Sequence, residues 1–141
     1  KKPWEREVDI VMPCATQNEI QPEDAKQIIA NGVKYIIEGA NMPTTNQAVE
    51  LLQKAGVIIG PGKAANAGGV ATSALEMAQN SMRISWTAEE VDLKLREIMK
   101  NIYNSCVRAS NRYGFGYDLI AGANIAGFTK VADAMISQGK Y

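Results

Sequence analysis

The chain has 141 residues, 46% of them hydrophobic, so it is one domain or part of one with enough apolar residues for a packed core. Fifteen basic and fifteen acidic residues cancel, so the charge gives no indication of binding to nucleic acid or to an anionic membrane. The chain contains no run of 18 apolar residues, so no membrane-spanning helix is predicted. The absence of histidine excludes Ser–His and Cys–His nucleophile pairs and histidine metal sites.

Strand and helix patterns alternate over the first sixty residues. Strands are predicted at 8–12, 33–38 and 57–59, and helices at 22–31 and 44–55. Short apolar strands joined by helices predict a parallel sheet with right-handed crossovers. Three strands are few for an open α/β sheet, and the chain begins without methionine. We therefore expect neighbouring strands to precede this chain in a longer protein.

Local signals predict the ends of these helices. Pro22 followed by two acidic residues is typical of a helix start. Thr44 and Gln47 have the spacing of a capping box. Gly32 and Gly56 are typical of helix ends.

After the third strand the pattern becomes entirely helical. Thr87 and Glu90 predict a second capping box, which begins a long amphipathic helix that Gly114–Gly116 breaks. A last helix is predicted to end near Gly139. The segment Gly122–Gly127 is rich in small residues, which favours close packing of two helices.

The two cysteines have no metal-binding spacing, and their small number fits a reducing cytoplasm. Cys106 lies on the apolar stripe of the long helix and is interpreted as a small core residue. Cys14 follows the first strand. We expect its side chain to be buried, with a reactive thiol as the alternative.

The stretch from Gly60 to Ser73 joins the third strand to the helical part. Its glycines let the backbone approach a ligand closely. If the helix begins after Gly68–Gly69, its free N–H groups form an anion site that Ser73, about one turn into the helix, can face. A long connecting loop with a glycine cap is the alternative. Lys63 could meet an anion there, although a single lysine in a loop is usually solvated.

Within this stretch, Gly60-x-Gly62-x-x-Ala65 matches the letters of the dinucleotide fingerprint. That fingerprint requires a helix that starts within it and a strand that follows the helix. Because the helix is expected to start after Gly69 and no strand pattern follows, we do not interpret this match as a dinucleotide site.

Three loops, 13–19, 39–43 and 60–73, follow the three predicted strands. In a parallel sheet the carboxyl ends of the strands share one edge, and ligands bind in the crevice there. We therefore expect these three loops to meet and to form a binding site. The third loop also joins the sheet to the helices, which suggests a hinge for closure of the cleft.

The polar side chains of these loops are mostly uncharged. Gln17, Asn41 and Asn66 carry amides that both donate and accept hydrogen bonds. Such groups suit a ligand with a carboxamide and ribose hydroxyls better than a bare phosphate cluster. Asn18 and Thr44 are interpreted as turn and cap residues.

Five segments resemble, in family order, the C-terminal part of the hexameric glutamate dehydrogenases. They are PCATQNE at 13–19, EGANMPT at 38–44, GKAANAGGV at 62–70, EMAQNS at 76–81 and GANIAGF at 122–128. The resemblance extends over essentially the whole chain.

The resemblance implies an α/β fold. Residues 1–66 would form the second half of a Rossmann-like parallel sheet, and residues 67–141 the helical C-terminal segment of an NAD(P)-binding domain. It implies a cytoplasmic homohexameric enzyme that interconverts L-glutamate with 2-oxoglutarate and ammonium by hydride transfer with NAD or NADP. The family's catalytic lysine and aspartate lie in an N-terminal domain outside this chain. The chain alone is therefore expected to be inactive and to self-associate.

The same match assigns site residues. Positions beside the nicotinamide–ribose end of the cofactor are Ala15, Thr16, Gln17 and Asn41. Positions that face the amino acid are Asn66, Gly69, Val70 and Ser73. Ser73 is the residue expected to hold the side-chain carboxylate of glutamate.

Two alternatives remain open. A leucine or phenylalanine dehydrogenase shares the architecture but would have a small apolar residue in place of Ser73. A stand-alone nucleotide-binding or interaction module is disfavoured, because an incomplete sheet leaves an unpaired strand edge. The sequence does not decide between NAD and NADP as the cofactor, because the residue that discriminates them follows a strand upstream of this chain.

Overall fold

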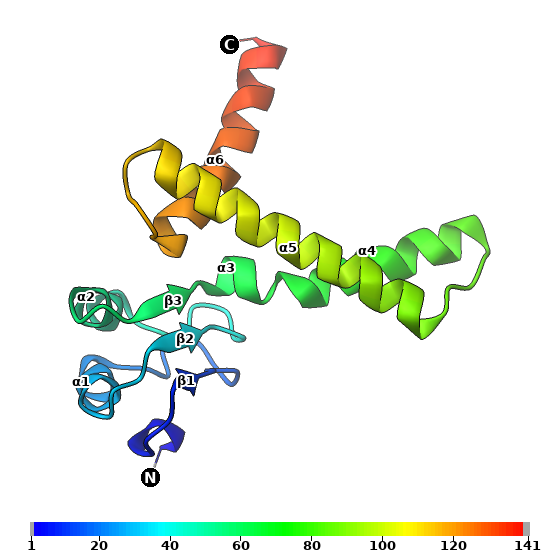
Figure 1. The fold of residues 1–141 in the computed structure, drawn as a ribbon. Coiled ribbons are helices and arrows are strands. Elements are labelled where there is room, and N and C mark those ends of the chain that lie inside the picture. The colour runs from blue at the N-terminus through cyan, green and yellow to red at the C-terminus, as the bar shows by residue number, and fades with distance from the viewer. Residues whose placement is uncertain (1, 140–141) are drawn as a thin grey trace.

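The computed structural model describes residues 2–139. Its first half alternates strands and helices: β1 (Ile10–Val11), α1 (Pro22–Ala30), β2 (Tyr35–Ile37), α2 (Asn46–Lys54) and β3 (Ile58–Gly60). The strands pair in parallel in the order β1-β2-β3 (Figure 1). The predicted alternation and parallel sheet are confirmed. The first two strands are shorter than the predicted ranges 8–12 and 33–38, whereas β3 has the predicted three residues and is shifted by one position.

The core lies between one face of this sheet and the helices α1 and α2. Ile36 of β2 and Ile59 of β3 point to this face and are buried with Ile28 of α1 and Leu52 of α2. Burial of such side chains contributes about 1.5–3 kcal/mol each. This packing holds the two crossover helices on the sheet and thereby fixes where the loops at its edge begin.

The N-terminal segment is tied to the start of α1. A short 3-10 helix, η1 (Pro3–Glu5), buries Trp4, whose indole Nε1 donates to the Asp24 carboxylate at 3.1 Å. Lys2 and the backbone N–H of Gln21 also donate to Asp24, at 2.6 and 2.9 Å. Burial raises the pKa of Asp24, but these hydrogen bonds together lower it below its usual value.

The start of α2 differs from the prediction. The N-cap is Thr45, and no capping box forms between Thr44 and Gln47. Thr44 instead forms an isolated parallel bridge with Ile20, so its backbone is extended. Its hydroxyl is buried and has no hydrogen-bond partner among the described residues. The long-range bridge therefore overrides the local capping signal.

The second half is helical, as predicted: α3 (Gly62–Ala65), α4 (Ala67–Met82), α5 (Ala88–Arg112) and α6 (Leu119–Gln138). The helices α4 and α5 form a hairpin that projects away from the sheet, and α6 crosses α5 before its far end extends beyond it (Figure 1). Within the described residues no strand follows β3, which supports one of the two grounds for rejecting a dinucleotide fingerprint. The other ground, a helix start after Gly69, is wrong, because α3 begins inside the motif.

The prediction that a loop continues to Gly69 is wrong. Helical structure begins at Gly62, and Asn66 joins α3 to α4. The physical reason is a buried contact: the carboxylate of Glu38 accepts a hydrogen bond from the Gly62 backbone N–H at 2.7 Å. Gly68 and Gly69 are therefore the second and third residues of α4 instead of the residues before the helix, and the Gly69 N–H donates to the Asn66 carbonyl at 3.2 Å.

The long helix α5 and its contact with α6 match the prediction closely. The hydroxyl of Thr87 accepts from the Glu90 N–H at 3.2 Å, and the Glu90 carboxylate accepts from the Thr87 N–H at 2.7 Å. Gly122 of α6 is buried against the backbone of Cys106, where a Cβ atom would overlap the carbonyl oxygen. The predicted close packing is therefore confirmed at Gly122.

The two cysteines differ in exposure. Cys106 is buried in α5, as predicted, and burial raises the pKa of its thiol. The prediction for Cys14 is wrong, because its side chain is exposed. The loop that follows β1 places it outside the core between the sheet and α1.

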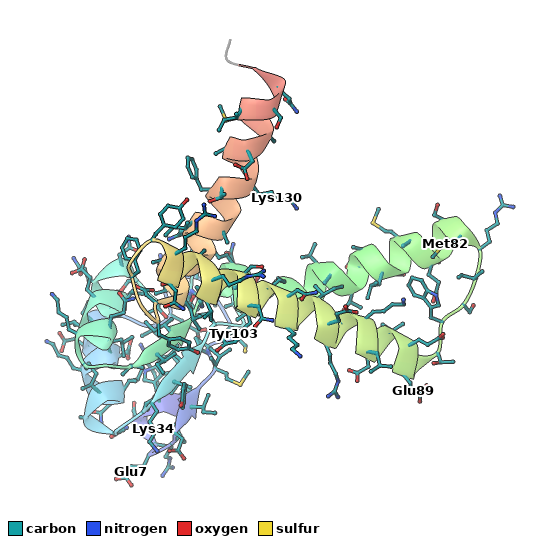
Figure 2. All side chains as sticks on the ribbon, turned by 45° about the horizontal axis from the view of Figure 1, so that its top comes forward. Glu7, Lys34, Met82, Glu89, Tyr103 and Lys130 are labelled. Carbon is teal, nitrogen blue, oxygen red and sulfur yellow. The ribbon has the colours of Figure 1, made fainter. Side chains whose placement is uncertain are left out.

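Large apolar side chains remain exposed on the helical part. Figure 2 shows side chains projecting from α4, α5 and α6 away from the sheet. The large apolar residues that are exposed on these helices include Val70, Met77, Leu93, Phe128, Met135 and Ile136. By length and composition alone α6 could cross a membrane, which is weak evidence because packed helices of soluble proteins pass the same test. The absence of a membrane span stays a prediction.

Candidate functional site

The loops after β1 and β2 meet at the carboxyl edge of the sheet, as predicted. The backbone N–H groups of Gly39 and Ala40 both donate to the carbonyl of Pro13, at 3.0 and 2.9 Å. The Asn18 N–H donates to the carbonyl of Met42 at 3.0 Å. These bonds hold the two loops side by side, so the residues at their tips share one edge.

The positions predicted to bind the cofactor lie on these two loops. The Ala15 N–H donates to the Glu19 carboxylate at 3.1 Å, and the Thr16 hydroxyl donates to the Gln17 carbonyl at 3.0 Å. The side chains of Gln17 and Asn41 are exposed, and their amides form no hydrogen bond with the described residues. Both amides are therefore available to a ligand at this edge.

The positions predicted to face the amino acid lie on α4 and at its start. They are Asn66, Gly69, Val70 and Ser73, and their spacing of three and four residues puts them on one helix face. The Asn66 amide donates to the Ala40 carbonyl at 3.4 Å, which connects this face to the loop of Asn41. Val70 is 71% exposed.

Ser73 lies in the second turn of α4 rather than near a helix start. Its hydroxyl is exposed and donates to the carbonyl of Gly69 at 3.3 Å, as serine often does inside a helix. This bond leaves the hydroxyl oxygen free to accept, and the hydroxyl can rotate to donate elsewhere. Ser73 thus lies further from the start of its helix than predicted, and its position on the exposed face of α4 is suitable for a ligand contact.

A cavity of about 630 Å³ opens beside the loop of Asn41. Gln17 and Asn41 line it, together with residues of α2, α3 and α6, whereas the α4 positions do not. Glu38, only 6% exposed, and Lys63 are its charged lining residues. Glu38 is not among the site residues predicted from the sequence, although a carboxylate at the end of a buried apolar strand indicates a role at this edge.

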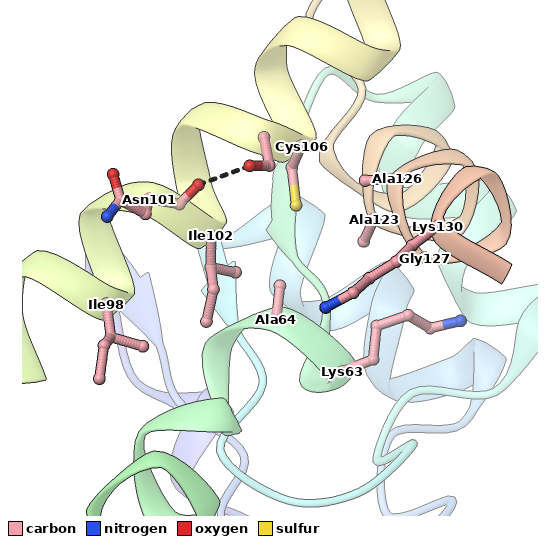
Figure 3. A pocket seen from close by; sticks show the side chains of 11 residues that line it. Lys63, Ala64, Ile98, Asn101, Ile102, Cys106, Ala123, Ala126, Gly127 and Lys130 are labelled. Atoms are coloured by element: carbon pink, nitrogen blue, oxygen red, sulfur yellow. Dashed lines mark hydrogen bonds between the residues drawn. The ribbon is translucent and has the colours of Figure 1, made fainter. Parts of the chain in front are cut away.

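A second cavity, of about 610 Å³, lies between α3, α5 and α6. Ile98, Ile102 and Ala123 give it apolar walls, and Figure 3 shows the side chains of Lys63 and Lys130 reaching over it from α3 and α6. Lys63 donates to the side-chain oxygen of Asn124. Neither lysine forms an ion pair with the described residues.

Comparison with known proteins decides the family. A family model described as glutamate/leucine/phenylalanine/valine dehydrogenase matches residues 1–139. The chain belongs to this family. It is 59% identical over 140 residues to the NAD-specific glutamate dehydrogenase of Clostridium symbiosum, covering 99% of this chain and 31% of that protein. It is 59% identical over 139 residues to the NADP-specific glutamate dehydrogenase of Escherichia coli K12, with the same coverage.

Solved structures of the family share the fold. A glutamate dehydrogenase structure that is 58% identical aligns with a TM-score of 0.94 over 99% of this chain and 31% of its own. The glutamate dehydrogenase of Plasmodium falciparum, 49% identical, aligns with a TM-score of 0.95 over 100% of this chain and 30% of its own. The chain thus spans about a third of the length of the family members it matches. The expected α/β fold, with a parallel half-sheet followed by helices, is confirmed.

Proposed function

We propose that the chain is the C-terminal part of the NAD(P)-binding domain of a glutamate dehydrogenase. The observation that carries this proposal is its identity of 59% to both an NAD-specific and an NADP-specific glutamate dehydrogenase over 99% of its length. The complete enzyme would interconvert L-glutamate with 2-oxoglutarate and ammonium. Residues 1–66 would be the half-sheet and residues 67–141 the helical segment of that domain.

The exposed carboxyl edge of the sheet fits a nicotinamide cofactor. The amides of Gln17 and Asn41, which pair with no residue of 2–139, offer both donors and acceptors to a carboxamide and to ribose hydroxyls. Ala15 and Thr16 bring backbone groups to the same edge of the sheet. NAD or NADP, when bound, would supply the acceptor for the hydride that leaves the α-carbon of glutamate. The role of these four residues would be to orient the nicotinamide–ribose end.

The exposed face of α4 would contact the amino acid. The Ser73 hydroxyl would donate a hydrogen bond to the side-chain carboxylate of glutamate. Gly69 and Val70 would form the wall of the substrate site beside this carboxylate. Asn66 would fix the distance between this face and the nicotinamide site, because its amide already binds the Ala40 carbonyl next to Asn41. These residues bind and orient, while the lysine and aspartate of the N-terminal domain would perform proton transfer.

The remaining features of the enzyme follow from the same proposal. It would be a cytoplasmic homohexamer, and the apolar side chains exposed on α4 and α6 would be covered by the rest of the polypeptide or by neighbouring subunits. The isolated chain would be inactive and would self-associate through these surfaces.

The test is an NAD(P)H-linked assay of the full-length protein with glutamate, leucine and phenylalanine, each with both cofactors. Turnover of glutamate alone is expected, because Ser73 offers a polar partner to a carboxylate. For Ser73→Ala we expect a higher KM for glutamate with little change in cofactor affinity, equivalent to the loss of one hydrogen bond to a charged group, about 1.5–3 kcal/mol. Turnover of leucine or phenylalanine instead, or an unchanged KM in the variant, would contradict this assignment.

A further inference from the structure

Glu38 binds the backbone on both sides of Pro61, at the point where β3 leads into α3. Its backbone N–H donates to the Gly60 carbonyl at 3.0 Å, and its carboxylate accepts from the Gly62 N–H at 2.7 Å. Pro61 has no N–H, and its ring restricts its φ, which is −69°. Glu38 is only 6% exposed and Gly62 is buried, so water competes little for the bond between them. A single side chain therefore fixes the turn from the sheet into the helices.

The helix α3 contacts the loop after β2 at both of its ends. At its start, a Cβ atom on Gly62 would lie 2.8 Å from the carbonyl oxygen of Ala40, a backbone atom that cannot rotate away. At its other end, the Asn66 amide donates to the same carbonyl at 3.4 Å. The space between α3 and this loop is thus filled, and its width matches the length of the Glu38 side chain.

The two halves of the proposed site extend from this contact in different directions. Asn41, assigned to the nicotinamide, follows Ala40 directly in the sequence. The helix face assigned to the amino acid, which includes Gly69 and Ser73, belongs to α4, and only Asn66 separates α4 from α3. The distance between the two halves therefore depends on how closely α3 is held to the loop.

We infer that Glu38 is a positioning residue that, through Gly62, sets the distance between the nicotinamide and the α-carbon of glutamate. This role rests on the proposed function. Two reacting atoms must lie about 3–3.5 Å apart, and a misplacement of about 1 Å can cost about a hundredfold in rate. A side chain of the wrong length at position 38 should therefore slow hydride transfer more than it weakens the binding of either ligand.

The test compares Glu38→Asp with Glu38→Gln in the full-length protein. Aspartate keeps the charge but is shorter by one methylene, a bond length of about 1.5 Å, so it must draw Gly62 closer or release it. Glutamine keeps the length, and its amide oxygen still accepts from the Gly62 N–H.

The two variants should differ in kcat and agree in KM. With glutamate as substrate, we expect kcat to fall about tenfold or more in Glu38→Asp and less than about threefold in Glu38→Gln. The KM values for glutamate and for the cofactor should change less than about threefold in both. Glutamate deuterated at the α-carbon should show a larger isotope effect on kcat in Glu38→Asp than in wild type, because hydride transfer instead of product release then limits turnover.

Glu50→Asp is the matched control, because Glu50 is exposed on α2 and lies outside this contact, and its kinetics should equal those of wild type. A wild-type kcat in Glu38→Asp overturns the role of Glu38, and so does an equal loss in Glu38→Gln, since the length of the side chain would then not matter. Wild-type protein that turns over no glutamate overturns the proposed function and this role with it, and that result is visible before any variant is compared.

Gly62→Ala keeps the test decisive if Glu38→Asp folds poorly. The added Cβ must shift the start of α3 away from the Ala40 carbonyl, while Glu38 itself is unchanged. We expect a several-fold lower kcat, little change in either KM and a larger isotope effect. The matched control is Gly127→Ala, where a Cβ meets nothing within 4 Å and kcat should not change. Equal kcat values in the two alanine variants would show that the spacing of α3 and the loop does not govern the reaction.

Discussion

Gly122 offers the most direct test of how the two long helices pack. Replacement of a helical glycine by alanine normally stabilises a protein by about 0.5–1 kcal/mol, because the unfolded chain loses freedom. At Gly122 a Cβ atom would overlap the carbonyl oxygen and carbon of Cys106. These are backbone atoms of α5, so no side-chain rotation relieves the overlap and the helices must separate. Overpacking of this kind costs about 1–3 kcal/mol, occasionally more.

Gly127, one and a half turns further along α6, is the matched control. A Cβ atom there meets nothing within 4 Å, so Gly127→Ala should gain the full helical stabilisation. The two variants should therefore differ by about 2 kcal/mol or more in the free energy of unfolding. Thermal denaturation followed by circular dichroism should place their midpoints at least about 6 °C apart, given about 3 °C per kcal/mol for a chain of this size. Equal midpoints would refute the close contact between α5 and α6.

Three further predictions concern single groups. The folded pKa of Asp24 is lowered, so its ionised form adds stability above its unfolded pKa of about 3.9, and this stability is lost as the pH falls through the folded value. Urea denaturation from pH 7 to 3 should show Asp24→Asn less stable than wild type at pH 7, with a difference that shrinks on acidification; a constant difference would contradict this. Iodoacetamide at pH 8 should modify Cys14 quickly and Cys106 only after unfolding, because burial raises the pKa of the latter. Mass spectrometry that found both labelled in the folded state would contradict the packing of α5. Thr87→Ala removes the capping box of α5 and should cost about 1 kcal/mol in chemical denaturation, whereas the same change at exposed Thr16 should cost little.

Much of the architecture could be predicted from the sequence because it depends on local periodicity. Short apolar runs between helices indicated the parallel sheet, and a parallel sheet brings the loops after β1 and β2 to one edge. The capping box at Thr87 and the small-residue contact at Gly122 were each predicted from a short motif of neighbouring residues in the sequence. These predictions needed no knowledge of distant contacts.

The parts that failed depend on contacts between distant residues. The helix begins at Gly62 because Glu38, 24 residues away, accepts a hydrogen bond from its N–H. The residues next to Gly62 in the sequence give no sign of this contact. Thr44 does not cap α2 because Ile20 pairs with it across the chain. The cavity between these elements was missed for the same reason. The assignment of Gln17, Asn41 and Ser73 to ligands stays a prediction.

The single residue Asn66 between α3 and α4 has a mechanical consequence. Because its backbone is itself helical, with φ −84° and ψ −3°, no slack separates the two helices, and any tilt of α3 is passed directly to α4. With a rise of 1.5 Å per residue, Ser73 lies about 10 Å and Met82 about 24 Å from this joint. A tilt of about 5° would then displace Ser73 by about 1 Å and the far tip of the hairpin by about 2 Å. A small tilt of α3 beside the sheet thus displaces every residue of α4 in proportion to its distance from Asn66. The displacement is small at Ser73, where a ligand would need accurate placement, and largest at the tip of the hairpin.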